Sequence, residues 1–353
     1  MKNSYFHVIL LHCINQLNGE RSVSAIYHLL NGKKSSQTIQ DGKLFNLTQM
    51  FSLFPKLSRH QINDACKHIL QEELIVQLPN QHYHLTEKGK LFLDKKRSER
   101  PIPVALNGWK YGDVSRIFWR RISLLVQVLS NYAYDNQHYL PLTKNQEDLL
   151  WVKLFLKQVP FSKSELIHLL YKELKQVLLL QSNRDATIFI QRLTSRNKIG
   201  QTFEQIALKQ NEDPIYTYLL FWNVIHFIME RQYLKENEDF VLHEIIIDKL
   251  TKNPLTSSTS MTRSYLLQGK SISEIAHMRR LKENTIEDHI VEITLHDRSY
   301  QPDHFLSSDD YERINHAIST LKTHQLKRVK EYLEHKYSYF QIRLAFALNG
   351  RKG

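Results

Sequence analysis

The chain has 353 residues, a formal net charge of +12 and only two cysteines. This length exceeds that of one ordinary domain, so we expect two or three domains. The basic balance favours an anionic partner such as nucleic acid. Residues 1–110 hold 15 Lys/Arg against 8 Asp/Glu, which concentrates the positive charge in the first third. Because Cys13 and Cys66 lie far apart in sequence, a disulfide framework is not expected.

The apolar segments are too short or too polar for export or membrane insertion. Residues 6–14 are interrupted by two histidines and lack a small-residue cleavage site. The longest apolar stretch, residues 218–229, contains an asparagine and a histidine and falls short of the roughly 20 residues that a membrane span needs. We therefore expect a cytoplasmic protein without a membrane partner.

A helical period dominates the chain, and 10 glycines and 9 prolines are too few to separate many strands. The fold is therefore expected to be mainly α. The pattern predicts helices at 3–17, 22–31, 43–52, 58–72, 86–97, 114–135, 145–158, 162–181, 184–195, 202–210, 214–234, 262–269, 271–279, 283–295, 307–321, 323–335 and 337–348.

One segment breaks the helical pattern. Strand-forming residues at 74–78 and 82–85 flank a turn-forming Pro-Asn-Gln at 79–81, which predicts a short β-hairpin. The hairpin follows the predicted helix 58–72 and precedes another helix, which is the element order of a winged helix. We therefore expect a basic, winged-helix-like domain at residues 1–97.

The predicted helix 58–72 has an apolar stripe on one side and hydrogen-bond donors on the other. Ser58 suits an N-cap, and the positive end of the helix can itself favour a phosphate. A donor-rich helix beside a cationic wing is typical of DNA binding, although a structural or a protein-binding winged helix remains an alternative. The DNA-binding hypothesis assigns contacts to Arg59, His60, Gln61, Asn63, Lys67, His82, Lys88, Lys90, Lys95, Lys96 and Arg97.

Two polar segments divide the rest of the chain. Residues 95–103 are charged and then interrupted by proline, and residues 253–260 are rich in hydroxyl groups, so both are predicted linkers. They delimit a helical middle domain at 104–252 and a C-terminal domain at 257–353.

Residues 257–295 carry the local signals of a helix-turn-helix. Gly269 can end the first helix in a left-handed conformation. Ser271 and Glu274 have the spacing of a capping box at the start of the second helix. Ile286 and Ile290 begin an apolar stripe on the third helix. Several independent local rules thus agree on this fold.

A family resemblance rests on these residues. The segments 267–276 (LQGKSISEIA) and 281–290 (LKENTIEDHI) are similar to the helicase-associated helix-turn-helix at the C-terminus of many bacterial RecQ-type helicases, which also occurs in the YpbB family. Residues 339–344 (YFQIRL) resemble the segment that ends that domain. The order of a basic N-terminal region, a helical middle and this module resembles the YpbB family along the whole chain.

The resemblance implies a role in DNA recombination or repair, with DNA and a RecQ-type helicase as partners. It does not imply helicase activity, because the Walker loop, the Asp-Glu-x-His box and the tetracysteine zinc site are absent from the sequence. One residue departs from the family pattern. Arg280 stands where such turns usually have glycine, so either Arg280 is left-handed or the turn differs.

The third helix of this module is expected to expose a mainly acidic side, on which Asn284 is the uncharged residue. Phosphates would repel such a side, so deep insertion into the major groove is disfavoured. The basic turn can instead touch phosphates from its edge through Arg279, Arg280 and Lys282. Alternatively, the acidic side docks a basic partner, or it is simply solvated. The residues of the docking hypothesis are Glu283, Glu287, Asp288 and Glu292.

No pattern of catalytic or metal-binding residues stands out. The 18 histidines do not fall at metal-ligand spacings, and there is no nucleophile elbow or dinucleotide loop. We expect no enzyme activity, no cofactor and no metal. The leading hypothesis is a non-catalytic DNA-binding accessory factor that acts with a RecQ-type helicase. The alternatives are a helix-turn-helix transcriptional regulator and a protein–protein adaptor without direct DNA binding.

Overall fold

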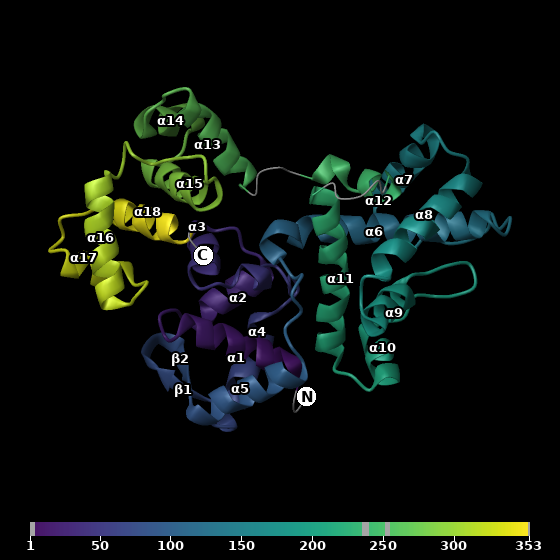
Figure 1. Cartoon of the computed structure of the whole chain (residues 1–353), viewed down its shortest axis with the longest axis horizontal. Coiled ribbons are helices and arrows are strands. Elements are labelled where there is room, and N and C mark those ends of the chain that lie inside the picture. Colours follow the sequence, from purple (N-terminus) through teal and green to yellow (C-terminus); the bar gives the residue numbers. More distant parts are fainter. Residues whose placement is uncertain (1–3, 235–239, 251–254, 352–353) are drawn as a thin grey trace. The chain divides into compact units, whose positions relative to one another are not determined.

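The computed structural model describes residues 4–234, 240–250 and 255–351. These residues are mainly helical and include a two-stranded antiparallel hairpin, which confirms the expected fold class (Figure 1). The chain forms two compact units. The first unit comprises residues 1–9 and 91–250, and the second comprises residues 10–90 and 251–353. The second unit thus combines segments from the predicted N-terminal and C-terminal domains.

The N-terminal segment has the local order of a winged helix. Its helix α4 is followed directly by the hairpin β1–β2, in which Ile75 pairs with Leu85 and Leu78 with His82. Gly89 allows α5 to start against the hairpin, because a Cβ atom there would lie 2.0 Å from the carbonyl oxygen of Leu74. The elements are α1 (Tyr5–Leu17), α2 (Val23–Asn31), α3 (Ser36–Leu44), α4 (Arg59–Gln71), β1 (Ile75–Leu78), β2 (His82–Leu85) and α5 (Glu87–Glu99), with 3₁₀ turns at Thr48–Met50 and Pro79–Gln81.

The predicted helix at 43–52 is wrong. The chain instead forms α3 and then a short 3₁₀ turn. Helix α3 reads Ser-Gln-Thr-Ile-Gln-Asp-Gly-Lys-Leu, a sequence with weak intrinsic helix propensity. It is stabilised by its N-cap, where the Ser35 hydroxyl accepts a hydrogen bond from the Thr38 N–H, and by burial of Thr38, Ile39, Gln40 and Asp41. Tertiary packing therefore decides this helix.

The first unit is built around α11, an apolar helix that packs against α6, α9 and α10. Two buried polar side chains of α11 fix the segment before α6. Asn223 accepts a hydrogen bond from the Ala105 N–H, and His226 accepts one from the Asn107 N–H. The elements are α6 (Gly108–Tyr132), α7 (Gln146–Gln158), α8 (Lys163–Leu178), α9 (Asn183–Arg192), α10 (Phe203–Gln210), α11 (Pro214–Leu234) and α12 (Phe240–Glu244), with a 3₁₀ turn at Ile247–Lys249.

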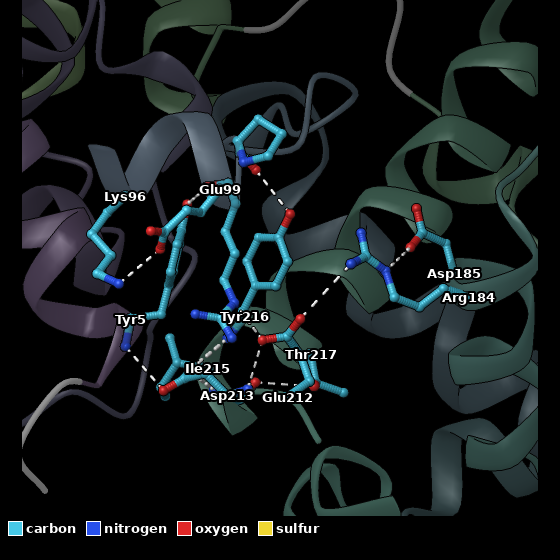
Figure 2. A network of polar contacts seen from close by, with 12 residues as sticks. Tyr5, Lys96, Glu99, Arg184, Asp185, Glu212, Asp213, Ile215, Tyr216 and Thr217 are labelled. Carbon is cyan, nitrogen blue, oxygen red and sulfur yellow. Dashed lines mark hydrogen bonds and ion pairs between the residues drawn. The ribbon is translucent and has the colours of Figure 1, made fainter. Parts of the chain in front are cut away.

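A polar network joins three segments of the first unit at the start of α11 (Figure 2). The Asp213 carboxylate accepts hydrogen bonds from the Tyr5 N–H at 3.0 Å and from two N–H groups in the first turn of α11. Arg100 forms an ion pair with Glu212 at 2.6 Å, and the Tyr5 hydroxyl donates to the Arg100 carbonyl. Burial raises the pKa of Tyr5, which keeps this hydroxyl protonated as a donor.

The C-terminal segment of the second unit confirms the predicted helix-turn-helix signals. Gly269 is left-handed (φ +77°), and Ser271 and Glu274 form the expected capping box. Arg280 is also left-handed (φ 52°, ψ 43°), so it replaces the usual glycine without a change of turn. The elements are α13 (Ser257–Leu267), α14 (Ile272–Arg279), α15 (Glu283–His296), α16 (Ser308–Leu321), α17 (Leu326–Tyr332) and α18 (Tyr339–Asn349).

Both predicted linkers are shorter than expected. Residues 95–99 belong to α5, and residues 257–260 belong to α13. Helix α13 begins early because the Thr256 hydroxyl accepts a hydrogen bond from the Thr259 N–H and so caps the helix. Residues 253 and 254 lie outside the described residues. Within residues 4–234, 240–250 and 255–351, no helix combines the length and apolar character needed to cross a membrane.

Because His226 is buried, we expect the stability of the first unit to depend on pH. Burial lowers its pKa from 6.5 to about 3, and nearby Arg116 adds to this effect. Between these values the unfolded chain binds more protons, so the free energy of unfolding falls as the pH falls, by up to about 1.4 kcal/mol per pH unit. A His226→Gln variant retains an acceptor for Asn107 but does not titrate, so its stability should depend less on pH.

Urea unfolding followed by tryptophan fluorescence measures this effect, because all four tryptophans (Trp109, Trp119, Trp151 and Trp222) belong to the first unit. Carboxylates contribute equally to the pH dependence of both proteins. The difference between wild type and variant therefore gives the contribution of His226 to the free energy of unfolding. An identical pH dependence of the two proteins would contradict this role of His226.

Candidate nucleic-acid interface

Helix α4 is held with one side in the core and the other in solvent. A capping box starts it, since the Gln61 N–H donates to the Ser58 hydroxyl and the Ser58 N–H donates to the Gln61 side chain. Its buried residues are Ile62, Ala65, Cys66 and Ile69. The structure therefore exposes the donor-rich side that the sequence predicts.

Some of the predicted contact residues on α4 are already engaged. Arg59 donates to the Ser24 hydroxyl at 2.7 Å and to His28 Nε2 at 3.2 Å, and its guanidinium lies 4.1 Å from the Tyr27 ring centroid. These contacts hold Arg59 against α2. His60 lies 2.8 Å from the Asp64 carboxylate, and Gln61 serves the capping box. Arg59 remains exposed, but it is not a freely oriented donor.

Three exposed side chains form an open line along α4, and we call them the α4 stripe: Asn63, Lys67 and Gln71. They are spaced by four residues, which places them on one side of the helix. Lys67 forms a long ion pair with Asp64 at 4.0 Å. Asn, Lys and Gln are the side-chain types that donate to base edges in the major groove. Asn63 and Lys67 are therefore the predicted contacts on α4 with the fewest partners in the protein, and Gln71 extends their line by one helical turn.

The turn of the β-hairpin at Pro79–Gln81 is separated from α4 by the strand β1. Asn80 and Gln81 both have positive φ angles, and the His82 ring N–H donates to the Gly19 carbonyl at 2.6 Å. His82 is thus only partly exposed and helps to fix the wing to the turn that follows α1. The wing tip itself presents polar side chains and no charge.

The predicted lysines of α5 are exposed, apart from the half-buried Lys96, and most of them are paired. Lys88 pairs with Glu73 at 3.4 Å, and Lys90 pairs with Glu87 at 2.7 Å. The remaining predicted residues of this helix, Lys95, Lys96 and Arg97, belong to the first unit rather than to the unit that contains α4. Lys96 pairs with Glu99 at 2.8 Å.

Helix α15, the third helix of the C-terminal helix-turn-helix, is largely enclosed. It packs against α13, α14 and α18 and also against α3 of the N-terminal segment (Figure 1). Of the residues expected on its open side, Glu283 and Asn284 are exposed, whereas Glu287 and Asp288 are half-buried. Only the first turn of α15 is therefore open to a partner.

The expectation that Glu292 is exposed is wrong. Its side chain is 5% exposed, and its carboxylate accepts hydrogen bonds from the Thr256 N–H at 2.6 Å and the Thr259 hydroxyl at 2.7 Å. Burial raises its pKa, against the effect of these bonds. Glu292 thus supports the start of α13, and its carboxylate is not accessible for docking. No local sequence pattern indicates this role, because the partners lie over thirty residues away.

Asp288 is engaged at the contact between α15, α18 and α3. Arg343 of α18 forms a hydrogen-bonded ion pair with Asp288 and also donates to the Ser36 hydroxyl at 2.7 Å and to Gln40 at 3.3 Å. This group of side chains, which we call the Arg343 junction, joins the N-terminal and C-terminal segments of the second unit. Burial raises the pKa of the neighbouring Glu287.

The basic turn before α15 is only partly available. Arg279 donates to the carbonyl and the hydroxyl of Ser258, both at 2.9 Å, and to the Thr262 hydroxyl. Its guanidinium therefore fastens α14 to α13. Arg280 and Lys282 are exposed. Of the predicted edge contacts to phosphate, these two side chains are the accessible ones.

Comparisons with known proteins agree with this architecture. A family described as "Helix-turn-helix domain" matches residues 258–346. Protein YpbB of Bacillus subtilis (strain 168) is 38% identical over 350 residues, which cover 98% of this chain and 97% of that protein. The chain belongs to the YpbB family.

Family membership confirms the resemblance found along the whole chain. The matched helix-turn-helix domain supports DNA binding, whereas the name of the Bacillus subtilis relative specifies no activity. No solved structure matches the chain.

We expect one substitution at the Arg343 junction to lower the stability of the second unit. Arg343→Ala removes a mostly buried cation and its bonds to both segments, which should cost about 1–3 kcal/mol. Amides of α3 and α15 should then exchange hydrogen faster in mass spectrometry. Arg328→Ala on α17 is the matched control, because Arg328 is exposed. Equal exchange in the two variants would show that the junction does not hold α3 on α15.

Proposed function

We propose that this protein is a non-catalytic DNA-binding accessory factor, and that it contacts DNA through the α4 stripe with the β1–β2 hairpin beside it. The observation that carries this proposal is the open line of Asn63, Lys67 and Gln71 on an otherwise anchored helix. Helix α15 is a poor reader by comparison, since most of it is enclosed and its exposed first turn includes Glu283.

The charge of this surface sets the expected mode of binding. Lys67 is its least paired cation, while Arg59, Lys88 and Lys90 already have partners in the protein. Such a surface neutralises few phosphates, so the dependence of affinity on salt should be moderate. A single module with three base-reading side chains covers only a few base pairs, which favours weak sequence preference over operator recognition.

We further propose that the factor acts with a RecQ-type helicase in recombination or repair. The support is the similarity of residues 267–276, 281–290 and 339–344 to the helicase-associated module, together with family membership over 98% of the chain. In this proposal the helicase supplies the unwinding, and this chain supplies DNA contacts and a docking surface. Arg280 and Lys282 would add phosphate contacts from the C-terminal module.

A substitution on the α4 stripe tests the DNA interface. Lys67→Ala with Gln71→Ala should weaken binding to duplex and forked DNA about tenfold or more and reduce the salt slope by about 1. Fluorescence anisotropy with labelled DNA at several salt concentrations measures both quantities. The matched control is Lys175→Ala with Gln176→Ala on α8, which removes the same pair of exposed side-chain types. If both double variants lose the same affinity, the α4 stripe is not the interface.

Co-elution in size-exclusion chromatography tests the helicase partnership. The full chain and the RecQ-type helicase of the same organism should elute together, and forked DNA should increase the fraction in complex. Absence of a complex with and without the DNA would refute the partnership while leaving DNA binding intact. A complex with the helicase but no DNA binding at physiological salt would instead favour an adaptor.

A further inference from the structure

Helix α7 in the first unit has two chemically distinct sides. One side is buried and contains Asp148, Val152 and Phe155. The opposite side is exposed and consists of two leucines and two lysines, which we call the α7 stripe: Leu150, Lys153, Leu154 and Lys157. These positions follow the spacing i, i+3, i+4 and i+7, so they lie on one face of the helix. Leu150 is 56% exposed and Leu154 is 44% exposed.

The lysines of the α7 stripe are electrostatically uncompensated. Within the described part of the chain, neither Lys153 nor Lys157 forms an ion pair, unlike most lysines of α5. Two acidic residues of α7 and α8 are turned inward, whereas Glu147 is exposed in the first turn of α7. Asp148 is 2% exposed and pairs with Arg120 at 2.6 Å. Glu173 of α8 is buried and accepts hydrogen bonds from two N–H groups at the start of α12.

Helix α7, which carries the stripe, is held in place by side chains of α6. Trp151 of α7 stacks on Phe155 at 5.0 Å, and the guanidinium of Arg121 lies 4.5 Å from the Trp151 ring centroid. The segment that leads into α7 is also fixed, because the buried Gln127 of α6 bonds to the backbone of Leu140 and Leu142. The exposed leucines therefore belong to an ordered surface.

We propose that the α7 stripe docks an acidic, amphipathic segment of a protein partner. Carboxylates of that segment would pair with Lys153 and Lys157, and its apolar side chains would cover Leu150 and Leu154. The positive charges of Lys153 and Lys157 favour a partner segment with negative charge. The leucines favour protein over nucleic acid, because phosphates would satisfy the lysines but leave two apolar side chains in water, and the stripe has no aromatic ring on which a base could stack.

This proposal goes beyond DNA binding, since the α7 stripe and the α4 stripe lie in different units. It also reverses the charge of the docking surface that the sequence suggests. The acidic side of α15 is largely occupied by contacts within the second unit, whereas the cations of α7 are open. A partner that docks here should therefore be acidic rather than basic.

Two synthetic peptides test the proposal with the full chain. One is a fluorescein-labelled helical peptide with leucines at the spacing of the stripe and glutamates beside them, and the other has lysine in place of each glutamate. The acidic peptide should bind with micromolar affinity and the basic one should not. Lys153→Glu with Lys157→Glu should weaken the acidic peptide at least tenfold and allow the basic peptide to bind, a reversal that general unfolding cannot produce.

Control variants distinguish the effect of this surface on peptide affinity from the effects of overall charge and of DNA binding. Lys172→Glu with Lys175→Glu on α8 changes the charge of the same unit equally and should leave peptide affinity within about twofold. Leu150→Asn with Leu154→Asn should weaken the acidic peptide as well. Forked DNA should bind the α7 variants as it binds the wild type, and the Lys67→Ala, Gln71→Ala variant should keep peptide binding.

Three outcomes would overturn the proposal. The first is no binding of the acidic peptide to the wild type in the micromolar range. The second is an equal loss of affinity in the α8 control, which would indicate non-specific attraction. The third is displacement of the peptide by oligothymidylate together with loss of oligothymidylate binding in the α7 variants, which would assign the stripe to nucleic acid.

Discussion

The second unit depends on the packing of α15 against α3, a helix that lies more than two hundred residues earlier in the chain. This contact turns what would be the reading helix of a helix-turn-helix into an interior element. At this contact Asp288 pairs with Arg343, which also bonds to α3, while Glu292 on α15 supports the start of α13. In the proposed mode of DNA binding, the helix-turn-helix serves mainly as a scaffold, and α4 of the same unit carries the reading surface.

Local sequence signals predicted the elements whose stability is local. The capping box at Ser271, the left-handed Gly269 and the turn between two strand-forming runs all act within a few residues, and all three are present in the structure. Helix α3 could not be predicted in this way, because its residues have weak helix propensity and its burial depends on distant helices. The predicted exposure of Glu292 on α15 was wrong for the same reason.

The candidate interface shows the same limit at the level of single side chains. Helical periodicity identified the exposed side of α4, but it could not show that Arg59 would be held by Ser24 and His28. Long-range contacts thus reduce a broad set of donors to three open ones. In the first unit, Lys153 and Lys157 have no ion-pair partner among the described residues, while Asp148 and Glu173 are engaged inside the fold. The numbers of basic and acidic residues in the sequence do not show which of these cations have partners in the fold.

The discontinuous second unit has a consequence for biosynthesis. Residues 10–90 leave the ribosome well before residues 251–353, so the surface of α3 that later covers α15 and α18 must wait for the synthesis of the intervening 160 residues. Contacts of such high sequence separation form slowly and leave apolar surface transiently exposed. A nascent chain released before the last helices would lack the cover of its N-terminal module, which makes early termination and slow translation hazards specific to this topology.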